Sequence, residues 1–347
     1  MIAGQCKKTV DGHPRYLVLL VTEACNLRCA YCYRGEQRYA QSMPCEVAEK
    51  ALHLASSSGC RFHVQITGGE PTLEPALVEW IASLVRKKGW PATIGIQTNG
   101  TNLDSSLLKV FKRYDVRVGV SLDGPPDVQE RVRGRAASTL KGLKLLTDKE
   151  VPFRVTTVVT GQNVHALGKL GLLLGGFPSA CGIGLDLLIE KGRAVNADMV
   201  RPPSPKDLKN GLKKLLQALN WVNEKRLHPV KLRELELLKQ AAAGKRNTSF
   251  CHAARGEAMA VLPGGTVYPC AQTAGDSRFA CGTVEAVDRK NAAKLGTYRL
   301  QDRDCGKCRI RSFCPGDCPS RLYYNDGQAR NLACIIYQSL WEEYERS

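Results

Sequence analysis

Three features are scarce in this chain of 347 residues: long hydrophobic runs, aromatic residues and local concentrations of charge. No apolar run approaches the roughly 18 residues that a membrane-spanning helix needs, which argues against a membrane partner. No basic segment followed by an apolar stretch marks an export signal, so we expect a cytoplasmic protein. Aromatic residues make up only 6%, and the Lys and Arg residues behind the formal net charge of +17 are spread along the chain. This pattern argues against a nucleic-acid partner.

Cysteine is the residue type that stands out against this background. The 15 cysteines are about 4% of the chain, too few for a small disulfide scaffold. Structural disulfides are rare in the cytosol, where cysteines are more often metal ligands or reactive thiols. We therefore expect the spacing of the cysteines to indicate the chemistry.

Apolar strands alternate with amphipathic helices from about residue 16 to residue 190. The predicted strands are Tyr16–Thr22, Phe62–Thr67, Thr93–Thr98, Arg117–Leu122, Phe153–Val159 and Ile183–Ile189. The predicted helices are Pro44–Ser57, Glu74–Lys88, Asp104–Tyr114, Ala136–Lys149 and Val164–Leu174. Strands joined by crossover helices predict an α/β fold with a parallel sheet, either a β/α barrel or a doubly wound sheet. The nearly continuous apolar character of the first strand predicts a sheet that is buried on both faces.

The pattern changes after residue 200. A Pro-rich stretch over 201–205 predicts a domain boundary, and the leucine-periodic, Lys-bearing segment behind it predicts a linker helix with a solvated basic face. A helix that binds an acidic partner is the alternative. From Phe250 onward Cys, Gly and Pro dominate, and this region has too little periodic apolar surface to fold without metal. We predict domains over residues 1–203 and 250–347, joined by a helical linker over 204–249.

A triple-cysteine loop follows the first predicted strand directly. Cys25, Cys29 and Cys32 have a C-x3-C-x2-C spacing, which lets three thiolates hold three corners of an iron–sulfur cube. The fourth iron is then open to a substrate or cofactor. A zinc site completed by a distant His or Cys is the alternative, although zinc loops more often contain C-x2-C pairs.

The loop and its surroundings resemble the radical S-adenosylmethionine (SAM) superfamily. Tyr31 is the aromatic residue before the last cysteine, and Gly68-Gly69-Glu70 after the second strand is similar to the family's Gly-Gly-Glu motif. Two glycines let the backbone approach the methionine end of SAM, and a carboxylate can accept its amino group. The resemblance implies a partial (β/α)6 TIM-like barrel that binds a [4Fe-4S] cluster and SAM.

Further candidates for SAM contacts follow the third and fourth strands. By resemblance, Ser121 contacts the ribose of SAM and Arg133 its carboxylate, while Asp123, Thr98 and Asn99 line the same site. A structural role is the alternative for two of them: Ser121 as the cap of a turn, and Arg133 as the partner of a surface carboxylate. The carboxyl ends of parallel strands meet at one edge, so we expect these residues to lie together.

The C-terminal third contains a second cysteine system. The seven cysteines are Cys251, Cys270, Cys305, Cys308, Cys314, Cys318 and Cys334. Seven thiolates at unequal spacings fit two cubane clusters better than one zinc ribbon, which needs two pairs. The arrangement resembles the SPASM domain, the auxiliary-cluster extension of radical SAM maturases, and includes its Gly265-x4-Cys270 element.

The SPASM resemblance implies two auxiliary [4Fe-4S] clusters, and so three clusters in all. The ligands of one are Cys251, Cys270 and Cys318, and those of the other are Cys305, Cys308, Cys314 and Cys334. The fourth position of the three-cysteine cluster is open, filled by Cys281, or filled by a substrate thiolate. Anaerobic sulfatase-maturating enzymes carry an Asp after the cysteine that matches Cys270. Ala271 stands there in this chain, which disfavours that activity.

The resemblance implies an enzyme that reductively cleaves SAM and abstracts hydrogen from a substrate. We expect a ribosomal peptide or a protein substrate, with a thioether or C–C crosslink as the product, and a reducing partner such as flavodoxin or ferredoxin. A radical SAM enzyme that modifies a tetrapyrrole or another small acidic substrate is one alternative. A non-catalytic zinc-ribbon protein that binds nucleic acid is the other.

Overall fold

A single curved sheet of nine strands organises the computed structural model, which describes residues 13–35, 40–195, 200–244, 251–298, 305–325 and 327–346. The order of the strands in the sheet is β7-β6-β5-β4-β3-β2-β1-β8-β9. All neighbouring pairs from β7 to β8 are parallel, and β9 runs antiparallel to β8. The strands are β1 (Tyr16–Leu20), β2 (Phe62–Thr67), β3 (Ala92–Thr98), β4 (Val116–Ser121), β5 (Phe153–Val159), β6 (Ala180–Leu187), β7 (Lys231–Leu232), β8 (Ala258–Val261) and β9 (Val267–Tyr268).

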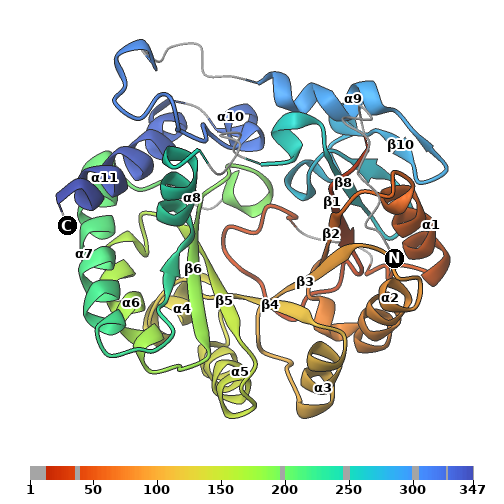
Figure 1. Ribbon diagram of the computed structural model, residues 1–347, viewed down its shortest axis with the longest axis horizontal. Helices are drawn as coiled ribbons and strands as arrows, with labels where there is room; N and C mark the ends of the chain where they lie inside the picture. Colours follow the sequence, from red (N-terminus) through yellow and green to blue (C-terminus); the bar gives the residue numbers. More distant parts are fainter. Residues whose placement is uncertain are drawn as a thin grey trace.

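Helices surround the outer face of this sheet, and Figure 1 shows the resulting ring of helices about a curved inner wall. The helices of the described residues are α1 (Cys45–Ser56), α2 (Pro75–Lys87), α3 (Ser105–Arg113), α4 (Pro126–Val132), α5 (Ala136–Asp148), α6 (Leu167–Gly175), α7 (Pro205–Asn223), α8 (Arg233–Ala242), α9 (Arg289–Lys294), α10 (Pro319–Tyr324) and α11 (Leu332–Arg346), of which α9 and α10 pack within the C-terminal segment. A small hairpin of β10 (Gly282–Thr283) and β11 (Ala286–Val287) lies outside the main sheet. The predicted α/β fold with a parallel sheet is confirmed.

The apolar core lies between the sheet and the outer helices. In β2 the side chains of Phe62, Val64 and Ile66 are at most 3% exposed. The alternate residues His63 and Gln65 are half-buried and line a cavity. A period of two therefore separates an apolar outer face from a polar inner face. The expectation of a sheet buried on both faces is wrong for β2, because its inner face encloses a cavity instead of a second apolar layer.

The C-terminal segment continues the barrel wall. Strand β8 pairs with β1 in parallel, with Tyr16 opposite Ala258 and Leu19 opposite Val261. At the other edge α11 packs against α7 and α8. The predicted helix after residue 204 is confirmed as α7, with Leu208, Leu212 and Leu215 buried on one face. Among the described residues, no helix is both long and apolar enough to cross a membrane.

Candidate active site

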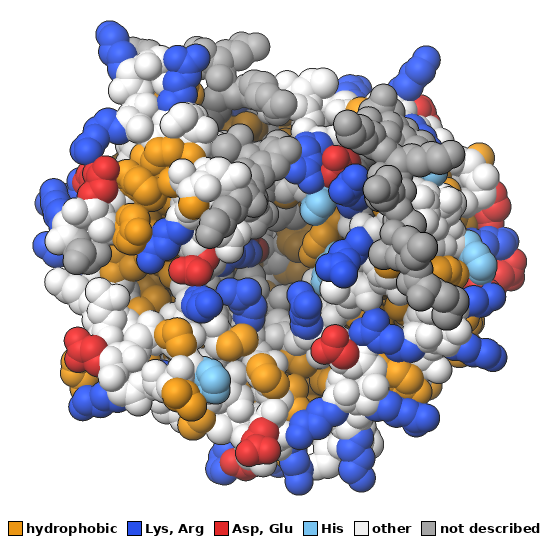
Figure 2. All heavy atoms as spheres, in the orientation of Figure 1, with side chains coloured by type: hydrophobic (Ala, Val, Ile, Leu, Met, Phe, Trp, Pro, Cys, Tyr) orange, Lys and Arg blue, Asp and Glu red, His pale blue; other side chains and the backbone are white. Residues whose placement is uncertain are grey.

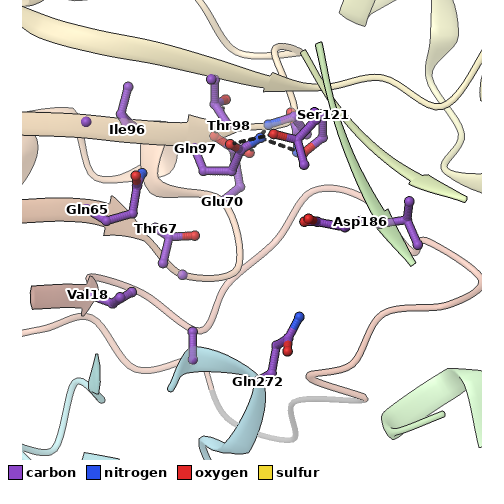
Figure 3. Close-up of a pocket in the computed structure, with 18 of the residues that line it drawn as sticks. Val18, Gln65, Thr67, Glu70, Ile96, Gln97, Thr98, Ser121, Asp186 and Gln272 are labelled. Atoms are coloured by element: carbon purple, nitrogen blue, oxygen red, sulfur yellow. Dashed lines mark hydrogen bonds between the residues drawn. The ribbon is translucent and has the colours of Figure 1, made fainter. Parts of the chain in front are cut away.

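A cavity of about 1640 Å³ occupies the inside of the curved sheet. Figure 2 shows the hollow near the centre of one face, with Lys and Arg side chains around it. In Figure 3, Gln65 and Thr67 of β2 and Asp186 of β6 extend toward one open space, and Gln272 extends toward it from the C-terminal segment. The inner faces of the strands and the loops at their carboxyl ends therefore define one chamber.

The triple-cysteine loop forms part of the wall of this chamber. Cys25, Cys29 and Cys32 all line it, immediately after the end of β1. Burial raises the pKa of Cys25 to about 11, and burial also raises the pKa of Cys29. A bound cation would offset this effect because it stabilises thiolates. Three thiols that face one roomy cavity fit three corners of an iron–sulfur cluster.

Gly68 and Gly69 bring the second strand against the cysteine loop. A Cβ on Gly68 would lie 2.4 Å from the Thr22 carbonyl oxygen, and a Cβ on Gly69 would lie 2.1 Å from that of Ala24. The φ angle of Gly68 is +152°, a value that residues with a side chain rarely adopt. The amide of Gly69 donates to Thr22 at 2.7 Å. The two glycines are therefore required by the backbone of the cysteine loop itself.

Glu70 fixes the loop that follows the third strand. Its carboxylate is 1% exposed. One oxygen accepts hydrogen bonds from the Thr72 amide at 3.1 Å and the Thr98 hydroxyl at 2.6 Å, and the other accepts from the Asn99 amide at 2.7 Å. Burial raises the pKa of Glu70, and these hydrogen bonds oppose that shift. The predicted contacts of Glu70, Thr98 and Asn99 with SAM stay predictions, while the structure gives all three a place in one hydrogen-bonded unit.

Tyr31, Asp123 and Arg133 form a second such unit beside Cys29. Asp123 is fully buried and accepts from Arg133 Nε at 2.7 Å, from the Val158 amide at 2.9 Å and from the Tyr31 hydroxyl. Arg133 Nη1 also approaches the Cys29 sulfur at 3.9 Å. Arg133 therefore pairs with a buried carboxylate, where the alternative from sequence had a surface one. Its contact with the SAM carboxylate stays a prediction.

Ser121 ends β4 at the same level of the chamber, where its hydroxyl accepts a hydrogen bond from Gln97 Nε2 at 3.0 Å (Figure 3). Sequence reasoning missed Gln97 and the other polar residues on the inner faces of the strands. The alternation of polar with apolar residues in β2 and β3 was the signal that could have identified them.

Three cysteines from the C-terminal segment face the same chamber. Cys251, Cys270 and Cys318 line it, although 48 residues separate the last two along the chain. Burial raises the pKa of Cys251 to about 11, and burial followed by the charges of Cys270 and Cys251 raises that of Cys318. The Cys318 thiol donates to Gln272 Oε1 at 3.3 Å. Each of the three thiols thus lies within electrostatic reach of another.

The remaining four predicted cluster cysteines are not among the residues that line the chamber. Cys308 and Cys314 pack at the edge of the main core, Cys305 is exposed, and Cys334 is part of α11. Gln338 Nε2 of α11 donates to the Cys308 sulfur at 3.5 Å. Within the described ranges, no three Cys, His, Asp or Glu side chains are grouped as ligands of a single metal ion. The assignment of these four cysteines to one cluster stays a prediction.

Residues 19–174 match the family model of the radical SAM superfamily. The chain therefore carries a radical SAM domain, and it is an enzyme of that type. This class implies a [4Fe-4S] cluster and SAM as cofactors, in agreement with the three cysteines that line the chamber. The non-catalytic zinc-ribbon alternative is set aside.

Relatives that match most of the chain include maturases. An uncharacterized protein of Methanocaldococcus jannaschii is 27% identical, over 88% of this chain and 99% of that protein. A cysteine-type anaerobic sulfatase-maturating enzyme of Clostridium perfringens is 26% identical, over 94% and 95%. The antilisterial bacteriocin subtilosin biosynthesis protein AlbA of Bacillus subtilis is 24% identical, over 92% and 70%. The chain is thus similar to radical SAM maturases along nearly its full length.

The fold matches a solved structure as well. The structure of native anSMEcpe with bound AdoMet superposes with a TM-score of 0.76 at 24% identity and covers 96% of this chain and 98% of the other. This match confirms the fold predicted from the sequence.

Proposed function

We propose that this radical SAM maturase-type enzyme modifies a peptide, with three [4Fe-4S] clusters, and forms a thioether or C–C crosslink. The observation that carries the proposal is that two sets of three cysteines line one cavity. One set is Cys25, Cys29 and Cys32, and the other is Cys251, Cys270 and Cys318. A substrate in that cavity would lie between a SAM site and an auxiliary cluster. Few other functions require two iron–sulfur ligand sets around one chamber.

The SAM cluster would be held by Cys25, Cys29 and Cys32. When bound, it supplies the electron that cleaves SAM and so generates a radical able to abstract hydrogen. The role of the chain is to fix the cysteine loop and to exclude water. Arg133 supports that role, since its guanidinium bridges the buried Asp123 carboxylate and the Cys29 sulfur.

The first auxiliary cluster would use Cys251, Cys270 and Cys318. Cys281 is the nearest candidate in sequence for a fourth ligand, but it is fully buried in the apolar core and its thiol donates to the Phe279 carbonyl at 3.2 Å. This packing favours a fourth position that is open or taken by a substrate thiolate. Cys305, Cys308, Cys314 and Cys334 would hold the second auxiliary cluster.

Two of the reported relatives act in the maturation of a sulfatase or the biosynthesis of a bacteriocin, which supports a protein or peptide as the substrate. Ala271 lines the chamber beside Cys270 and has no side-chain base. Sulfatase maturation is therefore the weaker of the two candidate activities. A reducing partner such as flavodoxin or ferredoxin would supply the electron for SAM cleavage.

Anaerobic purification with iron and sulfide analysis tests the cluster assignment, with about 12 iron atoms expected per chain. A Cys270→Ala variant should lose about four of them, while a Cys45→Ala control at an exposed helix start keeps all. Zinc in place of iron and sulfide would overturn the proposal. The substrate is sought by anaerobic co-expression with a short Cys-rich peptide encoded beside the gene. Loss of two hydrogens per crosslink is expected, and an unchanged peptide mass would count against that peptide as the substrate.

A further inference from the structure

Two arginines lie at the amino-terminal end of the same cavity. Arg117 of β4 and Arg154 of β5 both line it, and both are exposed to it. They alternate with the buried Val118 and Phe153, so their side chains share the inner face of the wall. Across the residues that the structure describes, neither guanidinium has a hydrogen bond or an ion pair. A charged pair that faces a cavity in this way is available to a ligand.

The wall of the cavity gives Arg154 a defined place. A Cβ on Gly182 of β6 would lie 2.7 Å from Arg154 Nε and 2.8 Å from Nη2. The guanidinium therefore lies flat over the glycine, across the neighbouring strand. Gly119 of β4 is opposite Arg154 in the register, but the space above it is taken by Gln97, whose Oε1 would lie 2.4 Å from a Cβ there. Gly182 thus makes space for a long cationic side chain on the inner face of the wall.

The other charged groups at this end do not neutralise the pair. Lys112 adds a positive charge, and Asp115 lines the cavity with its carboxylate 3.9 Å from Arg86 on the outer side. Higher in the chamber, Arg233 is already paired with Asp186 and Glu234, both at 2.7–2.8 Å. The end of the cavity that contains Arg117 and Arg154 is therefore positive.

We propose that Arg117 and Arg154 bind a carboxylate of the substrate. The substrate then carries an acidic group at a fixed distance from its reacting atom. The planar guanidinium matches the geometry of a carboxylate, and two such groups on the wall of one cavity favour an anion. A ribosomal peptide carries its negative charge as carboxylates. The inference rests on the proposed function, because it assigns the acidic group to the substrate of that reaction.

The geometry of β4 fixes the separation. Arg117 and Ser121 lie on the same inner face four residues apart, and four residues of strand span about 13 Å. The carboxylate would therefore bind about 13 Å from the level at which SAM is expected, a span of about four residues in an extended peptide. An acidic residue about four positions from the modified one is the sequence feature expected in the substrate.

Isothermal titration of the anaerobically purified full-length enzyme tests the site with named probes. The probes are a blocked tetrapeptide with one glutamate, its glutamine counterpart, and glutarate. Arg117→Gln and Arg154→Gln should each weaken binding of the glutamate peptide about tenfold or more, because each removes a hydrogen bond between two charged groups, and a tenfold change in Kd corresponds to about 1.4 kcal/mol. The glutamine peptide should bind equally to all variants. Arg113→Gln, an exposed arginine on α3 that does not line the cavity, is the matched control.

A third variant tests whether the position of the Arg154 charge matters, and not only its presence. Gly182→Ala retains both arginines but displaces the Arg154 guanidinium, and it should weaken the glutamate peptide as Arg154→Gln does. Melting temperatures show that the variants fold, and those of Arg117→Gln and Arg154→Gln should not fall below that of the wild type, because neither guanidinium has a hydrogen bond or an ion pair among the described residues.

Each outcome has a fixed meaning. Binding of the glutamate peptide that depends on both arginines supports the inference for a peptide, and the same dependence for glutarate alone assigns the site to a small acid. Equal binding to wild type and both variants, or no binding of any probe at about 10 mM, overturns the inference. Failure of the proposed function is read separately, as absence of SAM cleavage by the wild-type enzyme.

Discussion

The contact between Gly69 and the cysteine loop gives a quantitative test of how the site is assembled. A Gly69→Ala substitution would place a Cβ 2.1 Å from the Ala24 carbonyl oxygen and 2.7 Å from that of Glu23. Ordinary van der Waals contact begins near 3.4 Å, so the two backbones must separate by about 1 Å or more. Both contacts are to backbone, which cannot rotate away as a side chain can.

The expected cost follows from what this separation breaks. The Gly69 amide donates to Thr22 at 2.7 Å and the Glu70 amide donates to Ala24 at 2.8 Å. Loss of two backbone hydrogen bonds and overpacking of the interface together cost about 2–5 kcal/mol. The displaced loop also carries Cys25, so we expect weaker cluster retention in addition to lower stability.

Anaerobic urea denaturation followed by circular dichroism measures the stability, and iron analysis measures cluster retention. Gly161→Ala is the matched control, because its new Cβ would have its nearest neighbour at 3.5 Å and its φ is not in the left-handed region. We expect the control to change stability by about 1 kcal/mol or less. If Gly69→Ala unfolds at the same urea concentration as Gly161→Ala and retains its iron, the close approach of the two segments is not what the site requires.

Three further predictions concern the buried polar groups. Asp123→Asn should destabilise the protein by about 3–5 kcal/mol, because Arg133 is left as a buried cation. Asp127→Asn, which removes the exposed ion pair with Arg131, should cost about 1 kcal/mol or less. The midpoints of urea denaturation measure the difference in stability between the two variants. Glu70→Gln should lower the free energy of unfolding by about 1–3 kcal/mol, because an NH2 donor replaces one carboxylate oxygen and faces the donor groups of Thr98, Thr72 or Asn99. The same change should weaken SAM binding in a direct binding assay. Unchanged SAM affinity would contradict the role given to that unit. Burial lowers the pKa of His63 from 6.5, so the unfolded chain binds more protons and stability should fall as pH drops below 6.5; His63→Gln should flatten that part of a stability–pH curve, and an unchanged slope would refute the assignment.

The sequence predicted the strands closely where the period of two is strong. Phe62–Thr67 and Phe153–Val159 match β2 and β5 end to end. The sixth strand begins three residues before its predicted start, at Ala180, because its pairing with β5 continues past a register shift at Cys181, where the apolar pattern is interrupted. A turn of 3₁₀ helix over 164–166 delays the start of α6 to Leu167.

Other features depend on contacts that sequence patterns do not carry. Strand β8 has four residues, too few for a period, and its pairing with β1 is set by the fold of the whole C-terminal segment. The contacts expected between the predicted site residues and SAM stay predictions. The hydrogen bonds of these residues to one another, such as those of Glu70 with Asn99 and of Asp123 with Arg133, join loops from different strands and become visible only in three dimensions.

Production of 5′-deoxyadenosine from SAM tests the central claim most directly. The wild-type enzyme, reduced with dithionite under anaerobic conditions, should release it, and the Cys45→Ala control should match the wild type because that exposed thiol does not line the cavity. Cys29→Ala should release none while it retains the iron of the auxiliary clusters. Undiminished release by Cys29→Ala, or none from the iron-loaded wild-type enzyme, would contradict the account.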